Sequence, residues 1–120
     1  MKRFFVIAIL LVLFYACKPG VPKDIIQPEE MEKVLYDMHI VEGYVSNLPT
    51  PDTSKKVSAA YYKGVYKKFG IDSVLYNKSL NYYYTNPVLM KKMYDHITAK
   101  LAAAKEKQAK QDEKRLKPVE

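Results

Sequence analysis

Apolar residues recur at helical spacing in the first part of the chain that follows the strongly apolar N-terminus. We place the start of the helix at Pro28, because proline is favoured at the first helical position. Glu29 and Glu30 suit the positive N-terminal end of the helix dipole. Its apolar residues lie three, four or seven positions apart, as on one face of a helix. They are Met31, Val34, Leu35, Met38, Val41 and Val45. The pattern predicts a helix over 28–46, ended by the proline-containing stretch 47–52.

A second helix is predicted over 54–69. Ser54 is placed to cap its start, and Gly70 follows its end, where glycine readily adopts the left-handed conformation that closes a helix. Its apolar stripe consists of Val57, Tyr61, Val65 and Phe69.

Two more helices follow in the sequence. Asp72 is a suitable cap for a third helix over 72–85, and Asn86-Pro87 forms a cap and first turn for a fourth over 87–104 or longer. The stripe of the third helix is Tyr76, Ser79, Leu80 and Tyr83, and that of the fourth is Met90, Met93, Tyr94, Ile97, Leu101 and Ala104.

These elements predict an all-α fold, a small bundle of four helices over residues 25–104. No stretch alternates with period two, so strands are not expected, and short connections place consecutive helices antiparallel or at steep angles. Residues 105–120 form a charged tail with six basic and four acidic residues. The tail either extends the fourth helix or is disordered.

The first 16 residues have the pattern of a lipoprotein signal peptide. Lys2 and Arg3 precede an unbroken run of twelve apolar residues, 4–15, and the small residue Ala16 follows it. A membrane-spanning helix needs about 20 such residues, so the run is typical of a secretory signal. The next residue, Cys17, is the only cysteine and resembles the acylated residue of a lipobox, with cleavage between Ala16 and Cys17. The alternative is a free thiol after an uncleaved anchor.

Lipidation at Cys17 would make the membrane the first partner of this chain. Residues 17–24 contain two prolines and a glycine and predict a short tether. Several acyl chains hold a protein stably in a bilayer, whereas one is marginal. No acidic cluster follows the cysteine, which favours an outer-membrane position facing the periplasm. Despite the net charge of +7, nucleic acid is not expected as a partner in the cell envelope.

The acidic residues and histidines do not form a recognisable metal or catalytic motif. Asp37, His39 and Glu42 on the first helix, with Asp95 and His96 on the fourth, are the candidates. Helical di-metal sites use Glu-x-x-His pairs, which are missing here, and the wheel positions do not converge. We therefore expect no metal, no cofactor and no enzyme activity, and a partly buried Glu42 held by a tyrosine hydroxyl or a lysine.

Tyrosine is unusually abundant, with ten of the eleven outside the leader. Four lie on the apolar stripes and are expected in the core, namely Tyr61, Tyr76, Tyr83 and Tyr94. Four others lie off the stripes and are candidates for a partner surface, namely Tyr36, Tyr66, Tyr82 and Tyr84. Exposed tyrosines are enriched at protein interfaces. The alternative is that they form the rim of a small bundle.

Charge is segregated between the first two helices. Residues 29–45 hold five acids and one base, whereas residues 54–70 hold five lysines and no acid. This arrangement fits either complementary packing of the two helices or a lysine face directed at anionic lipid headgroups.

Several motifs together resemble a family of short Bacteroidota lipoproteins, the domain of unknown function 4296. The similar residues are Lys68-Phe69-Gly70-Ile71, then Tyr76-x-x-Ser79-Leu80-x-Tyr82-Tyr83, then Asn86-Pro87, with Met31, Asp37-Met38-His39 and Glu42 in the first helix. The resemblance covers roughly residues 25–101. It implies a cell-envelope context and a helical shape, but no mechanism.

The sequence therefore predicts a non-catalytic envelope lipoprotein that docks to another envelope protein or serves as an accessory subunit. The alternative is a helical lipoprotein that binds a small ligand or lipid. A cavity above about 300 Å³ would favour the ligand carrier, and a filled core would favour docking.

Overall fold

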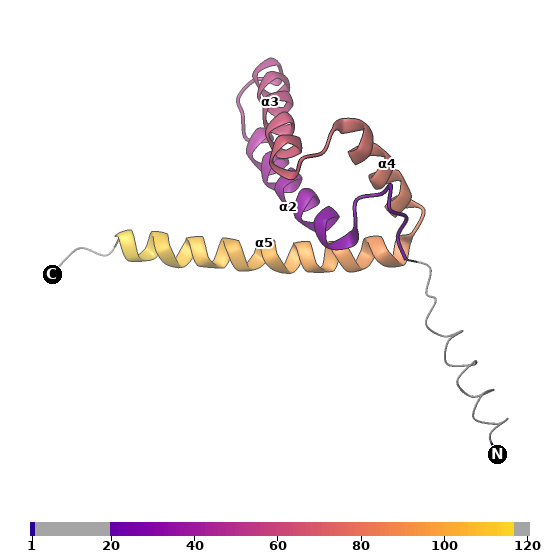
Figure 1. Cartoon of the computed structure of the whole chain (residues 1–120). Helices are drawn as coiled ribbons and strands as arrows, with labels where there is room; N and C mark the ends of the chain where they lie inside the picture. The colour runs from indigo at the N-terminus through magenta and orange to yellow at the C-terminus, as the bar shows by residue number, and fades with distance from the viewer. Residues whose placement is uncertain (2–19, 117–120) are drawn as a thin grey trace.

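The computed structural model describes Met1 and residues 20–116, and this part of the chain is all-α (Figure 1). Its helices are α2 (Pro28–Val45), α3 (Pro51–Phe69), α4 (Ser73–Tyr84) and α5 (Pro87–Leu116). They confirm the predicted small bundle of four helices. The predicted signal peptide, with Ala16 and Cys17, lies outside the described residues. None of the described helices is both long and apolar enough to cross a membrane.

The connection between α3 and α4 is determined by two residues that were predicted to end and start these helices. Gly70 takes the left-handed conformation, with φ of 63°, which glycine adopts without a side-chain clash. Asp72 then caps α4, because its Oδ1 accepts a hydrogen bond of 2.7 Å from the backbone N–H of Leu75. The chain therefore changes direction within three residues.

The start of α3 differs from the sequence prediction, whereas Asn86 lies at the predicted cap position, where its carbonyl accepts from the Met90 N–H at 3.1 Å. α3 begins at Pro51, not near Ser54, because Thr50 is the cap and its hydroxyl accepts from the N–H of Thr53 at 3.3 Å. The proline occupies the first helical position, where a missing N–H costs nothing. Asn86 uses its side-chain amide to donate to the Tyr82 carbonyl at 2.7 Å, which closes the end of α4.

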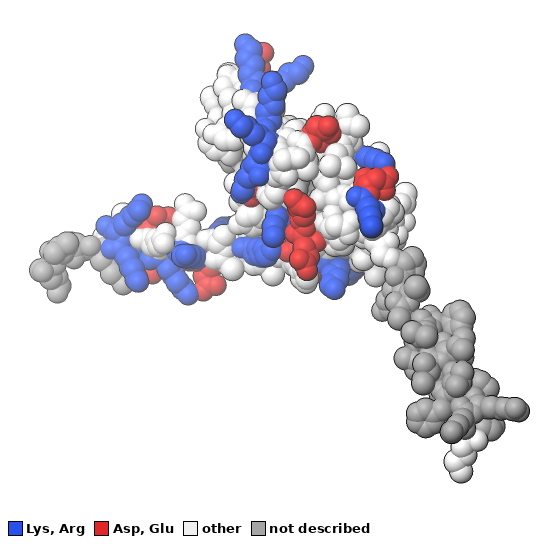
Figure 2. Space-filling model, viewed as in Figure 1, with Lys and Arg blue, Asp and Glu red and all other residues white. Residues whose placement is uncertain are grey.

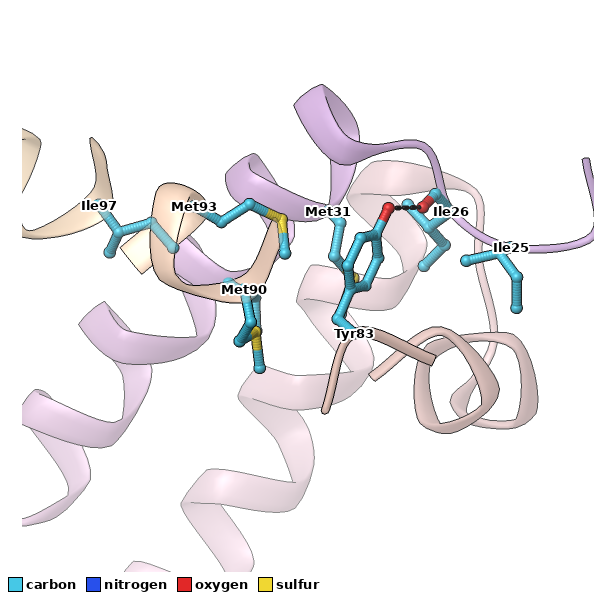
Figure 3. Packing of buried hydrophobic residues seen from close by; sticks show 8 residues of the cluster. Ile25, Ile26, Met31, Tyr83, Met90, Met93 and Ile97 are labelled. Atoms are coloured by element: carbon cyan, nitrogen blue, oxygen red, sulfur yellow. Dashed lines mark hydrogen bonds between the residues drawn. The ribbon is translucent and has the colours of Figure 1, made fainter. Parts of the chain in front are cut away.

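The buried residues form two clusters that α2 joins. The larger cluster lies where the N-terminal segment, α2, α4 and α5 meet (Figure 3). It comprises Ile25, Ile26, Met31, Leu35, Tyr83, Met90, Met93 and Ile97. The smaller lies between α2 and α3 and comprises Val34, Met38, Val41 and Val65. The apolar stripe of α2 is therefore divided between two neighbours.

The packed domain begins earlier than the predicted boundary at Ile25. Val21 packs against the larger cluster, and a turn bonds the Ile25 N–H to the Pro22 carbonyl at 3.1 Å. Lys78 of α4 also pairs with Asp24. Part of the predicted tether therefore belongs to the folded domain.

α5 extends well beyond the rest of the domain. Figure 1 shows the start of α2 against α5 and the α2–α3 hairpin rising steeply from it, whereas the second half of α5 continues past the hairpin. Residues 102–116 are exposed throughout. The charged tail is therefore helical as far as Leu116, which is the first of the two alternatives that its sequence left open.

Candidate functional site

The residues of the Tyr76–Tyr83 motif hold the N-terminal segment against α4. The backbone N–H of Ile26 donates to Ser79 Oγ at 2.9 Å, and the Tyr83 hydroxyl donates to the Ile26 carbonyl at 2.7 Å (Figure 3). Ser79 and Tyr83 are both fully buried. Together they form hydrogen bonds with the N–H and the carbonyl of the buried Ile26. Leaving these buried backbone groups without partners would cost free energy. This part of the motif is therefore structural.

Burial changes the ionisation of the tyrosines in this region. It raises the pKa of Tyr76 and of Tyr83 to about 12, with smaller contributions from nearby tyrosines. Burial also raises the pKa of Tyr62, Tyr66 and Tyr94. The fold therefore favours the neutral phenol at all five positions.

We expect alkaline pH to destabilise the protein over a defined window. Tyrosine in the unfolded chain ionises near pH 10, so between about pH 10 and 12 the unfolded chain has lost protons that the folded chain keeps. Stability therefore falls as pH rises through this window and is unaffected by these groups below it. Urea unfolding followed by circular dichroism at a series of pH values measures the decline. Tyr76→Phe should make it shallower, and equal slopes for both proteins would contradict the prediction.

The candidate metal ligands are engaged in separate pairs. His39 Nδ1 lies 3.1 Å from Glu42 Oε2, and Asp37 bonds to Lys68 at 2.6 Å. In the part of the chain that the structure describes, no three His, Cys, Asp or Glu residues group to hold a metal ion. Glu42 is exposed and its partner is His39, so the predicted buried Glu42 with a tyrosine or lysine partner was wrong.

The histidine and carboxylate of the α2–α5 contact form a small charged cluster. Glu32 accepts from Lys100 at 2.6 Å and lies 2.9 Å from His96 Nδ1, while Asp95 pairs with Lys91 on the same helix. The hydrogen bond from Lys100 holds the pKa of Glu32 below its ordinary value, although burial opposes this. These contacts orient α5 against α2.

The four tyrosines predicted as a partner surface come from three helices and differ in exposure. Tyr36 is half-buried beside the larger cluster. Tyr66 packs on Tyr76 with ring centroids 5.6 Å apart, and Tyr82 meets the edge of Tyr83 at 5.3 Å. Only Tyr84, 62% exposed, stands largely in solvent. Tyr36, Tyr66 and Tyr82 therefore pack at the margin of the core, and the partner surface stays a prediction.

Tyr61 was predicted in the core but is 48% exposed. Residues four apart advance about 40° beyond a full helical turn, so the stripe from Val57 to Phe69 slants around α3. Only Val65 of that stripe faces α2 closely enough to be buried. Of the other predicted core tyrosines, Tyr83 is buried, while Tyr76 and Tyr94 are half-buried.

The exposed side of Tyr61 belongs to an apolar groove between α2 and α3. Tyr61 meets Tyr44 edge to face, with centroids 5.5 Å apart, and Ile40 lies one turn before Tyr44. Ile40 and Tyr44 are 49% and 52% exposed. The groove is open to solvent, has a volume of about 420 Å³ and is lined by Asp37, Ile40, Val41, Tyr44, Tyr61 and Val65. We call it the tyrosine groove.

A second hollow lies next to the tyrosine groove, where α5 meets α2 and α3. It has a volume of about 290 Å³ and is lined by Lys33, Tyr36, Asp37, Lys68, Phe69 and Lys100. Asp37 lines both hollows. We call the second hollow the lysine groove, because α2, α3 and α5 each contribute one lysine to it.

Sequence reasoning missed Ile40 and Tyr44. Both lie outside the core stripe of α2, and their i, i+4 spacing forms a second apolar ridge on that helix. That ridge was the available signal, because two large apolar residues one turn apart on the polar side of a helix are unusual.

The comparisons with known proteins identify a family but no characterised relative. The sequence model described as Domain of unknown function (DUF4296) matches residues 22–107. No curated protein matches the chain, and no solved structure matches it.

Proposed function

Because the chain belongs to the family described as Domain of unknown function (DUF4296), whose description states no activity, we propose a role from its own surface. In this proposal the protein is a non-catalytic lipoprotein of the cell envelope that docks to another protein as an accessory subunit. The observation that carries this proposal is the tyrosine groove, where Ile40, Tyr44 and Tyr61 leave about half of each side chain in solvent. Tyrosine-rich apolar surfaces of this kind are favoured at the centres of protein interfaces.

The grooves also bear on the alternative of a ligand carrier. The tyrosine groove is larger than the lower limit of about 300 Å³ for ligand sites, but it is an open channel between two helices. A carried lipid needs most of its surface covered, whereas a protein segment can cover such a channel and remain partly solvated. The open form therefore favours docking.

An acyl anchor at Cys17 would hold this domain close to a bilayer. The sequence supports the anchor. In the fold, Val21 packs against the core, so the packed domain begins only four residues after Cys17. Four residues of extended chain reach at most about 14 Å. The proposed location is the outer membrane, facing the periplasm, with the domain held near its surface.

We expect metabolic labelling with a fatty acid to mark the wild-type protein through Cys17. The Cys17→Ala variant lacks the thiol that would be acylated, so it should carry no label. Gel fluorescence of an alkyne-tagged fatty acid measures this. Equal labelling of both proteins would contradict the anchor without affecting the docking surface.

Docking is tested by photo-crosslinking at single positions in living cells. A photoreactive phenylalanine derivative at position 44 or 61 should give one discrete adduct with another protein, because both side chains face the groove. The same group at Tyr84, which is equally accessible but lies on α4, is the matched control. Discrete adducts at all three positions, or at none, would contradict docking through this groove.

The same surface predicts a selective loss of affinity. With the captured partner purified, Tyr61→Ala should weaken binding by roughly 30-fold, since an aromatic hot spot contributes about 2 kcal/mol. Its stability should change by no more than about 0.5 kcal/mol, as for other surface positions. Titration calorimetry and thermal melting separate the two effects.

A further inference from the structure

The tyrosine groove and the lysine groove are neighbours along the α2–α3 hairpin and share one lining residue. Asp37 lies at their junction. From Lys33 to Tyr44 the surface follows eleven residues of α2, which is about 16 Å at 1.5 Å per residue. One end is apolar and aromatic, and the other is lined by lysines.

The lysine end carries more positive than negative charge. Lys68 is paired with Asp37, and Lys100 is paired with Glu32. Lys33 forms no ion pair within the described residues, so one lysine of the groove has no carboxylate partner. Lys68 and Lys100 remain 63% and 54% exposed, whereas their partners Asp37 and Glu32 are only 22% and 14% exposed. An incoming carboxylate can therefore pair with Lys33, while Lys68 and Lys100 keep their partners and add their exposed positive charge to the groove.

The surroundings strengthen this positive field. Residues 54–70 of α3 and its end hold five lysines and no acid, and Figure 2 shows blue side chains along α3. Lys68 is the lysine that pairs with α2, and Lys56 pairs with Asp52 of its own helix. The predicted complementary packing of the two helices therefore accounts for one of these five charges. A positive surface of this kind steers negatively charged partners toward it.

Resting on the docking function proposed above, we propose that the groove binds an acidic amphipathic helix of a partner protein. Its apolar side chains, one turn apart, pack between Ile40, Tyr44 and Tyr61, and its carboxylates lie at the Lys33 end. A groove between two antiparallel helices accepts a third helix, and about 16 Å corresponds to three helical turns. The partner segment is therefore about eleven residues long, with acidic residues toward one end.

Charge argues against a second copy of this chain as the occupant. The only described helical segment that is exposed on all sides is residues 102–116 of α5. It contains five basic and three acidic residues, so its net charge has the same sign as the lysine groove. It also lacks two large apolar residues one turn apart.

A displayed peptide library tests the proposed occupant directly. Each 14-residue peptide has leucines fixed at two positions one turn apart, and the other positions are randomised among Glu, Lys, Gln and Ala. Selection uses the full-length protein in nanodiscs of zwitterionic lipid. On the wild type we expect enrichment of Glu over Lys on one side of the leucines. On Lys33→Glu the preference at those positions should reverse toward Lys.

Affinities of one enriched peptide provide the quantitative test. Lys33→Glu should weaken binding about tenfold at low salt, and the effect should fall below about twofold near 1 M salt, where charges are screened within about 3 Å. Lys63→Glu makes the same charge change on α3 outside the groove lining and should change the affinity by less than about twofold. Tyr61→Ala should weaken binding of the same peptide by roughly 30-fold, since an aromatic hot spot contributes about 2 kcal/mol.

Each other outcome overturns the inference in a distinguishable way. If Tyr61→Ala weakens binding but Lys33→Glu leaves the Glu preference unchanged, docking stands and the acidic helix is wrong. If no enriched peptide depends on Tyr61, this groove does not bind a helix, and the crosslinks at positions 44 and 61 decide docking separately. A dimer in sedimentation velocity that Tyr61→Ala dissociates would identify a second copy as the occupant. Protection of Lys33 from acetylation by phosphatidylglycerol nanodiscs alone would identify a lipid surface.

Discussion

Tyr83→Ala is expected to lower the free energy of unfolding by about 3–5 kcal/mol, the range for removing a large core aromatic. The ring is fully buried in the larger cluster, and its hydroxyl holds the Ile26 carbonyl. The substitution removes both contributions, so it opens a cavity and leaves a buried carbonyl without its donor. Chemical denaturation followed by circular dichroism measures the change.

Two variants separate the free-energy cost of the cavity from the cost of the lost hydrogen bond. Tyr83→Phe keeps the ring and removes only the hydroxyl, so it should cost about 1–3 kcal/mol, the penalty of an unsatisfied buried polar group. Tyr84→Ala removes the neighbouring exposed ring and should cost no more than about 0.5 kcal/mol. Similar losses at positions 83 and 84 would show that the N-terminal segment is not held as described.

The second large effect is expected at Ile97, in the half of α5 that packs on the domain. Its side chain is 1% exposed and contacts the same cluster as Met31 and Met93. Ile97→Ala should cost about 2–5 kcal/mol through lost burial and the cavity left behind. The free energy of unfolding from urea titration is the measurement.

The other half of α5 supplies the control on the same helix. Leu116 is 82% exposed, so Leu116→Ala should change stability by no more than about 0.5 kcal/mol. Hydrogen exchange should be slow around Ile97 and fast over residues 102–116, because a helix without tertiary contacts is marginal. Uniform protection along α5 would contradict this division.

The helix boundaries were predictable because their causes are local. Pro28 and Pro87 start helices, Asp72 caps one with its own carboxylate, and Gly70 ends one through its backbone conformation. The start of α3 differs from the prediction at Ser54 because a second local signal lies just before it in the sequence. Thr50-Pro51 is itself a cap followed by a favoured first residue.

The candidate site was far less predictable. The stripe on α2 correctly identified its buried residues, but nothing in the spacing showed that Met31 and Leu35 belong to one cluster and Val34 and Val41 to another. The motif around Ser79 and Tyr83 carries the family resemblance, but its sequence does not show what these residues do. That role depends on Ile26, which is more than fifty residues away in sequence.

The sequence by itself determined most of the helix boundaries, that the described fold is all-α, and which family the chain resembles. These properties follow from interactions among residues within a few positions of each other. Only the tertiary structure decided which side of each helix is covered. Tyr61 is exposed and Ile40 and Tyr44 form a groove with it because no described helix packs over that side of the α2–α3 hairpin. A side chain is buried only when a segment distant in sequence packs against it. The spacing of apolar residues within one helix does not show which segment that is.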